Sequence, residues 1–372
     1  MLWPISKVNG SSLNWLDEVH KEFYVQMFAG NCFTNCFSNE FIDVLIDSIN
    51  TDVYFTAVYD LYKKLSIEEQ IRYRSIFEQQ INFIALFNDM TRSIIQANTP
   101  NLKKILVASR KLGGYLYSTT LDLQCFKAAM TKKFGARLRL SNMNEHFQSF
   151  KAINGNVCCF CGLENMIAET LVEAEPGSPV EEKPQHRASY DHFLPKKDYP
   201  FLAVNFDNLI PCCSTCNEKF KKAKDPLIEN EIRQLAFKPF SNEVVNLEVN
   251  YENVDGDFKK IRVSIPNTNC DIEYKSQSWN RIFETIDRAN HTLEHNFKEE
   301  WISYLLSSHN NLHGAKAKLK EVGVSLSGRV KQSREAYFKS LCYLYLSNMD
   351  DKTMTPLLRA VSDSFAQRIG KI

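Results

Sequence analysis

The sequence predicts an α+β protein that is mostly helical, with a small mixed unit of strands and a helix in its middle. Three observations support this fold class. Helical periodicity runs through residues 12–152, two Cys-x-x-Cys motifs bracket a mixed segment near the centre, and alternating apolar and polar residues follow at 244–265. We therefore expect a helical region at 1–152, a central module at 153–235, and a β-hairpin followed by helices at 236–372.

The N-terminal region shows its clearest helix signal at Ser66. Its hydroxyl is expected to cap a helix while Glu69 reaches back to the same turn, a capping box that precedes an apolar run. Pro100 and the pair Gly113-Gly114 are interpreted as punctuation between helices. Residues 126–140 contain five Lys or Arg and no acidic residue, which indicates either a basic face beside the central module or a solvated helix face.

The C-terminal region begins with a hairpin signal, in which two alternating runs flank Asp255-Gly256-Asp257. From about residue 276 an apolar stripe at helical spacing continues to 305, and further helices are expected at 315–346 and 352–369. Two histidine pairs four residues apart, His291 with His295 and His309 with His313, are interpreted as exposed helical residues and not as metal ligands.

Composition indicates an ordinary globular protein of 372 residues. Hydrophobic residues make up 44%, and 45 Lys and Arg against 44 Asp and Glu leave a net charge of +1. Any attraction to nucleic acid must therefore come from a local patch, because overall charge provides none. The N-terminus shows no secretory signal, and no apolar run approaches the ~18 residues that cross a bilayer. We expect a cytoplasmic protein without a membrane partner.

Six of the eleven cysteines fall into two clusters, which favours metal binding in a chain of this size without an export signal. Cys158 with Cys161, and Cys213 with Cys216, have the spacing of zinc knuckles, in which a tight turn aims two thiolates at one ion. The doublets leave the register open, since Cys159 or Cys212 can replace a neighbour. The alternative to structural zinc is two unrelated pairs of buried thiols.

Between the knuckles lie an acidic segment at 163–183, interpreted as an exposed loop, and then the motif Ser189-Tyr190-Asp191-His192-Phe193-Leu194-Pro195, followed by Asn208 and Asn217. This arrangement resembles the HNH, or ββα-metal, endonuclease family, in the subtype bracketed by a four-cysteine zinc site. The resemblance covers about 70 residues. It combines an acid-His pair, a proline three residues later, and two asparagines in order.

The resemblance implies a role for each motif residue. His192 corresponds to the general base that activates water, and Asp191 and Asn217 correspond to ligands of a catalytic Mg²⁺ or Mn²⁺. Asn208 corresponds to the asparagine that hydrogen-bonds across the loop and fixes the strand that carries the base. The last motif residue is Asn and not His, which favours Mg²⁺ over tight transition-metal binding.

The functional hypothesis that follows is a metal-dependent endonuclease acting on DNA. Four lysines after the second knuckle are predicted to contact phosphates: Lys219, Lys221, Lys222 and Lys224. An unsupported charge run is typical of a solvated face, but its place beside a phosphodiesterase site favours contact. The large helical flanks resemble those of bacterial anti-phage defence effectors, which implies a partner protein such as an ATPase. The alternatives are a catalytically silent zinc-dependent binding or scaffold protein, and an RNase with the same site.

Overall fold

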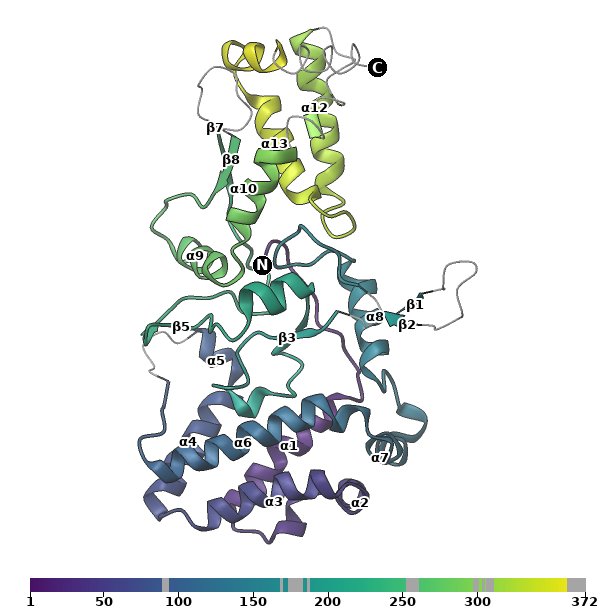
Figure 1. The fold of residues 1–372 in the computed structure, drawn as a ribbon, viewed down its shortest axis with the longest axis vertical. Helices are drawn as coiled ribbons and strands as arrows, with labels where there is room; N and C mark the ends of the chain where they lie inside the picture. The colour runs from purple at the N-terminus through teal and green to yellow at the C-terminus, as the bar shows by residue number, and fades with distance from the viewer. Residues whose placement is uncertain are drawn as a thin grey trace. The chain divides into compact units, whose positions relative to one another are not determined.

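The computed structural model describes residues 1–88, 94–167, 170–172, 183–185, 188–251, 261–296, 301–302, 305 and 311–359 (Figure 1). Within these residues the chain is mostly helical and contains four two-stranded antiparallel sheets, which confirms the predicted α+β fold class. Contacts divide the chain into two compact units. One comprises Ile5–Asn154 and Ile167–Asn242, and the other comprises Met1–Pro4, Gly155–Met166 and Glu243–Ile372. The linear domain boundaries expected from the sequence stay a prediction.

In the described part of the first unit there are eight α-helices, with short 3-10 turns between some of them. They are α1 (Asn14–Phe28), α2 (Asn39–Asp47), α3 (Ile49–Lys63), α4 (Ile67–Ile81), α5 (Phe83–Asn88), α6 (Pro100–Ser118), α7 (Gln124–Phe134) and α8 (Met143–Asn154). Helix α3 packs on α6, and α2 packs on α7. The predicted capping box at the start of α4 is confirmed, because Ser66 Oγ accepts from Glu69 N and the Glu69 carboxylate accepts from Ser66 N.

The structure of α6 differs from what was expected of its glycines. Pro100 does occupy the first turn, capped by Thr99, but Gly113 and Gly114 lie inside the helix and do not end it. Two interior glycines cost a helix roughly 1 kcal/mol each relative to alanine. Buried Leu112 and Leu116 keep this part of α6 packed on the core, so tertiary contacts override the local signal.

The strands of the first unit are short. They are β1 (Thr170–Val172), β2 (Lys183–Gln185), β3 (Tyr190–His192), β4 (Leu209–Pro211), β5 (Ile228–Glu229) and β6 (Ile232–Arg233), paired in that order as three hairpins. Most of the predicted acidic loop, 168–169 and 173–182, lies outside the described residues. Between β3 and β4 is the 3-10 turn η4 (Pro200–Leu202), and β4 leads to the π-helical turn η5 (Thr215–Lys221).

The turn η4 is anchored in the helical core of the first unit. Phe201 is fully buried, and its ring meets Tyr24 of α1 edge-on at 4.8 Å between centroids and Phe77 of α4 at 5.2 Å. Aromatic rings of 150–250 Å² each dominate the energetics of such a core. The loop between β3 and β4 is therefore held by the N-terminal helices.

The second unit contains the predicted hairpin and the C-terminal helices. They are β7 (Glu248–Tyr251), β8 (Ile261–Ser264), α9 (Asp271–Phe283), α10 (Thr285–Asn296), α12 (Leu312–Ser327) and α13 (Ala336–Asn348), with a further helical stretch at 351–359. Strands β7 and β8 pair antiparallel, which confirms the hairpin, while its expected Asp-Gly-Asp turn lies outside the described residues.

Over the described residues 276–296, the predicted apolar stripe is divided between α9 and α10. Glu284 adopts a left-handed conformation with φ of 49° and ends α9. The break is held because Trp279 Nε1 and Thr285 Oγ1 both donate to the Phe160 carbonyl, at 3.1 and 3.2 Å. The Phe283 ring also stacks on that of Phe160 at 4.2 Å.

None of the described helices has the length and apolar character that a membrane span requires.

Candidate functional site

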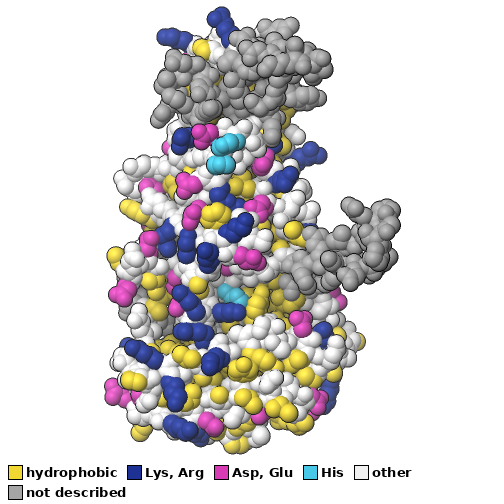
Figure 2. Space-filling view, in the orientation of Figure 1, with side chains coloured by type: hydrophobic (Ala, Val, Ile, Leu, Met, Phe, Trp, Pro, Cys, Tyr) yellow, Lys and Arg dark blue, Asp and Glu magenta, His cyan; other side chains and the backbone are white. Residues whose placement is uncertain are grey.

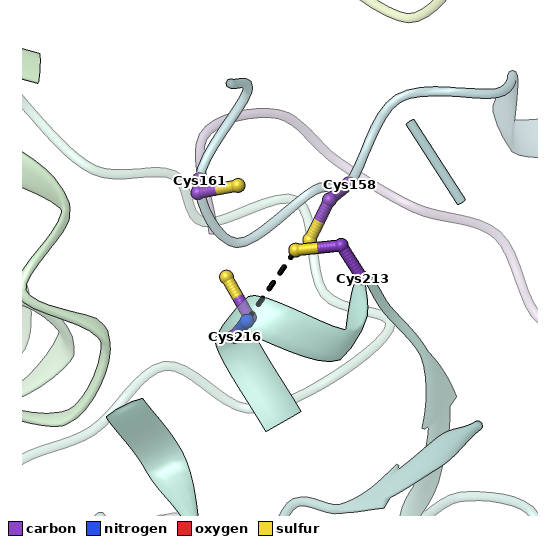
Figure 3. Close-up of side chains that lie close together, drawn as sticks. All are labelled: Cys158, Cys161, Cys213 and Cys216. Carbon is purple, nitrogen blue, oxygen red and sulfur yellow. Dashed lines mark hydrogen bonds between the residues drawn. The ribbon is translucent and has the colours of Figure 1, made fainter. Parts of the chain in front are cut away.

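The two cysteine knuckles form one cluster. The ligand sulfurs of Cys158, Cys161, Cys213 and Cys216 all lie within 4.8 Å of one another, and all four residues are buried (Figure 3). Sulfurs around a tetrahedral ion at ~2.3 Å lie ~3.8 Å apart, so the cluster has the size and donor chemistry of a metal site. Among the described residues, no other group of three or more His, Cys, Asp or Glu ligand atoms converges in this way.

Local structure aims each knuckle. In the first, Gly162 N donates to the Cys158 carbonyl at 2.8 Å, and Gly162 has a positive φ of 66° that closes the turn. In the second, Cys216 N donates to Cys213 Sγ at 3.4 Å at the start of η5, the dashed line in Figure 3. Cys159 lies outside the four-sulfur cluster, and its sulfur is 3.9 Å from that of Met1. The geometry therefore selects the register that the regular two-residue gap favours.

Asp191 and His192 lie on β3, opposite Ile210 and Leu209 of β4. The side chain of Asn208, immediately before β4, hydrogen-bonds across the loop between the two strands. Its Oδ1 accepts from Leu194 N at 2.7 Å, and its Nδ2 donates to the Leu194 carbonyl at 2.9 Å and to the Leu202 carbonyl at 3.3 Å. Asn208 is fully buried, so these bonds are shielded from water.

His192 is held in one orientation by a backbone acceptor. Its Nε2 lies 2.9 Å from the Ala203 carbonyl. A carbonyl only accepts, so Nε2 carries the proton and the neutral ring keeps its lone pair on Nδ1. Nδ1 makes no hydrogen bond to any described residue. Burial, followed by the nearby positive charge of Lys196, lowers the pKa of His192 to about 3, so the ring is neutral at physiological pH.

Asp191 is buried beside a cation. Its Oδ1 lies 3.6 Å from Nζ of Lys221, which is itself fully buried and also donates to the carbonyls of His192 at 3.0 Å and Lys224 at 3.1 Å. The other oxygen, Oδ2, is buried and has no hydrogen-bond partner among the described residues. Burial raises the pKa of Asp191, and the Lys221 ammonium opposes that rise. A buried acceptor without a partner is costly, and a cation at this position would satisfy it.

Asn217 lies on η5, one residue after the second knuckle. Its Nδ2 donates to Ser189 Oγ at 2.6 Å, just before β3. The amide oxygen forms no hydrogen bond to a described residue and stays available as a ligand. Asp191 and Asn217 thus retain oxygen donors of the type that Mg²⁺ and Mn²⁺ prefer.

The four lysines after the second knuckle occupy different environments. Lys219 and Lys222 are exposed and Lys224 is half-buried. Lys221 differs from its predicted role, because its burial and its three oxygen neighbours leave its ammonium no access to a phosphate. The spacing of four residues from Asn217, one helical turn, is the signal that could have identified Lys221 as an inward-facing residue.

Helix α6 also contributes to the site, which the sequence did not indicate. The Tyr117 ring meets the His192 ring edge-on at 4.5 Å between centroids, and Nζ of Lys196 lies 5.2 Å from the centre of the same Tyr117 ring. One turn earlier, Gly113 packs against the loop so closely that an added Cβ would lie 2.7 Å from Ala203 Cβ and 2.8 Å from the Pro200 carbonyl oxygen.

Among the described residues, the other histidine candidates belong to no converging group of three or more metal ligands. His291 and His295 are exposed, and their rings stack at 4.1 Å, as expected for helical residues four apart. His309 lies outside the described residues.

Comparison with known proteins gives one local similarity. Over 41 residues, 10% of this chain, the sequence is 49% identical to Septu protein PtuB of Bacillus thuringiensis. The matched segment spans 16% of that protein. No family model matches the chain, and no solved structure matches it.

Proposed function

We propose that this protein is a metal-dependent HNH-type endonuclease that hydrolyses phosphodiester bonds in DNA, with residues 153–235 as its nuclease module. The observation that carries the proposal is the state of His192. Its Nε2–H is held by the Ala203 carbonyl, which leaves the Nδ1 lone pair free, and the preceding residue, Asp191, keeps a buried carboxylate oxygen without a partner among the described residues. A neutral imidazole with a fixed orientation can accept a proton from water, and the carboxylate offers an oxygen ligand to a cation.

Each residue has a separate task in the proposed reaction. Nδ1 of His192 accepts the proton from the attacking water. Asn208 braces the loop so that the Ala203 carbonyl and β3 keep their positions during the transfer. Asp191 and Asn217 would hold Mg²⁺ or Mn²⁺, which supplies Lewis-acid stabilisation of the charge on the phosphate and the leaving oxygen. The exposed Lys219 and Lys222, with Lys224, would contact flanking phosphates.

Structural zinc is the metal that we propose for the cluster of Cys158, Cys161, Cys213 and Cys216. Four buried thiolates leave no open coordination position for substrate or water, which is typical of structural sites. The two metals therefore have different roles, since zinc maintains the fold and the oxygen-bound ion takes part in catalysis.

The local similarity to a Septu protein supports a role as an effector in anti-phage defence. In that setting the helical flanks would bind a partner protein such as an ATPase, and co-expression with that partner should change the cutting. Unaltered, vigorous cutting by the isolated chain would count against regulation of this kind.

The test is a nicking assay on supercoiled plasmid with Mg²⁺ or Mn²⁺, comparing the wild type with His192→Ala. His291→Ala, an exposed histidine on α10, is the matched control. We expect His192→Ala to abolish nicking with zinc content unchanged, and His291→Ala to cut like the wild type. Equal cutting by all three proteins would rule out the role of His192. Cutting of a parallel RNA substrate alone would identify an RNase, and no cutting of either substrate would favour the zinc scaffold.

A further inference from the structure

Helix α6 presents an unusual charge pattern next to the proposed catalytic site. Its 19 residues include four basic side chains and no acidic one, and all four are exposed: Lys103, Lys104, Arg110 and Lys111. None of them forms an ion pair with a described residue. Some exposed basic residues on other helices are paired, as Arg74 is with Glu78 on α4 and Lys318 is with Glu321 on α12.

The four side chains share one face of α6. At 100° per residue, Lys103, Arg110, Lys111 and Lys104 fall with Tyr117 in a sector of about 140°, and the buried leucines lie on the opposite side. Figure 2 shows dark-blue side chains gathered over the region where Figure 1 labels α6. From Lys103 to Tyr117 the helix rises ~21 Å, a length of about six base-pair steps.

The basic face of α6 ends at the proposed catalytic site, and packing fixes its position there. Tyr117 contacts the His192 ring, and Lys196 adds a further cation above the Tyr117 ring. Gly113 locks α6 against the same loop that supplies the hydrogen-bond acceptor of His192. The positions of these charges relative to the proposed reaction centre are therefore set by packing.

The basic segment at 126–140 that the sequence indicated, part of which lies on α7, is a weaker candidate. Lys132 is paired with Asp43 at 2.8 Å, and Lys133 lies 5.3 Å from the centre of the Trp15 ring. These two cations are already engaged within the protein, whereas the four on α6 form no ion pair with a described residue.

We infer that the exposed basic face of α6 is a track for the phosphodiester backbone of a nucleic acid and guides the scissile strand to His192. That the strand is guided to His192 rests on the proposed nuclease function. Binding of nucleic acid to this face does not depend on cutting and is measured separately. Each phosphate neutralised on duplex DNA contributes about 0.9 to the slope of log affinity against log salt.

The experiment uses the full chain with His192→Ala, so that bound nucleic acid stays intact. The track variant carries Lys103→Gln, Lys104→Gln, Arg110→Gln and Lys111→Gln. The control variant loses the same charge from exposed residues of the other unit, by Lys320→Gln, Arg329→Gln, Arg334→Gln and Lys352→Gln. Affinities for fluorescein-labelled duplex DNA and duplex RNA of one sequence are measured by anisotropy over a range of salt. Far-UV circular dichroism and zinc content check that both variants fold.

For the duplex that binds more tightly, we expect the track variant to lose at least about tenfold in affinity and about 2–4 from the salt slope, with the control unchanged. Unchanged binding by the track variant, an equal loss in both variants, or no binding of either duplex by His192→Ala would overturn the track. Nicking by the wild type is scored separately. If the track variant loses binding and the wild type does not nick plasmid, the track is supported and the nuclease function is refuted. If the wild type nicks plasmid and the track variant binds unchanged, the nuclease function is supported and the track is refuted.

Discussion

Gly113→Ala tests whether α6 is built to approach the catalytic loop, and Gly114→Ala is its matched control. Each substitution gains roughly 0.8–1.0 kcal/mol of helix propensity, since both positions lie inside α6. Gly114 faces open space, and apart from its own helix backbone and chain neighbours no heavy atom lies within 4 Å of an added Cβ. At Gly113 the added Cβ would lie 2.7 Å from Ala203 Cβ and 2.8 Å from the Pro200 carbonyl oxygen. The backbone of α6 or of the loop would have to move to relieve these contacts, which costs free energy of folding.

The expected difference in stability between the two variants follows from these contacts. Overpacking a well-filled interior costs roughly 1–3 kcal/mol, so Gly113→Ala should be less stable than Gly114→Ala by about that amount. Gly114→Ala itself should be about 1 kcal/mol more stable than the wild type. A difference of 1 kcal/mol corresponds to about 2–4 °C in Tm for a unit of 150–250 residues.

Thermal and urea unfolding followed by circular dichroism measures the difference in stability. Nicking assays at a temperature where all three proteins are folded measure the effect on the site. Because Ala203 supplies the acceptor for His192 Nε2, we expect Gly113→Ala to cut more slowly and Gly114→Ala to cut like the wild type. Equal stability of the two variants would refute the close approach, and equal stability with equal cutting would refute the link to His192 as well.

Three further predictions concern the cysteine cluster, Lys221 and His192. Cys158→Ser should release zinc and lower Tm, whereas Cys159→Ser should retain one zinc per chain by atomic absorption; the opposite result would change the ligand register. Lys221→Met should destabilise the fold by about 3–5 kcal/mol, because it leaves a buried carboxylate uncompensated, while exposed Lys222→Met should have little effect in urea unfolding. The lowered pKa of His192, about 3, keeps the ring neutral from pH 5 to 8. The His192 ring should therefore stay unprotonated as the pH falls from 8 to 5. As long as the zinc content is constant, the pH profile of kcat should show no inflection near pH 6.5 that is attributable to His192. An inflection there that coincides with imidazole protonation by NMR would contradict the burial argument.

Local chemistry explains which features were predictable from the sequence. The capping box at Ser66 depends on residues three apart, and the hairpin of β7 and β8 depends on alternation along each strand. Both are therefore predictable from the sequence alone. The cysteine knuckles are equally local, since each is a short turn that aims two sulfurs. Glu284 shows the limit, because the left-handed break after α9 is held by bonds to the distant Phe160 carbonyl.

The candidate site divides in the same way. Sequence alone determined the chemical types and their order, which are four cysteines in two knuckles, the acid-His pair and two asparagines. Only the tertiary structure decided that Lys221 is a buried partner of Asp191 and that Gly113 brings α6 against the loop beside His192. The reason is that burial and close approach depend on residues brought together from distant parts of the chain, and local spacing contains no information about those contacts.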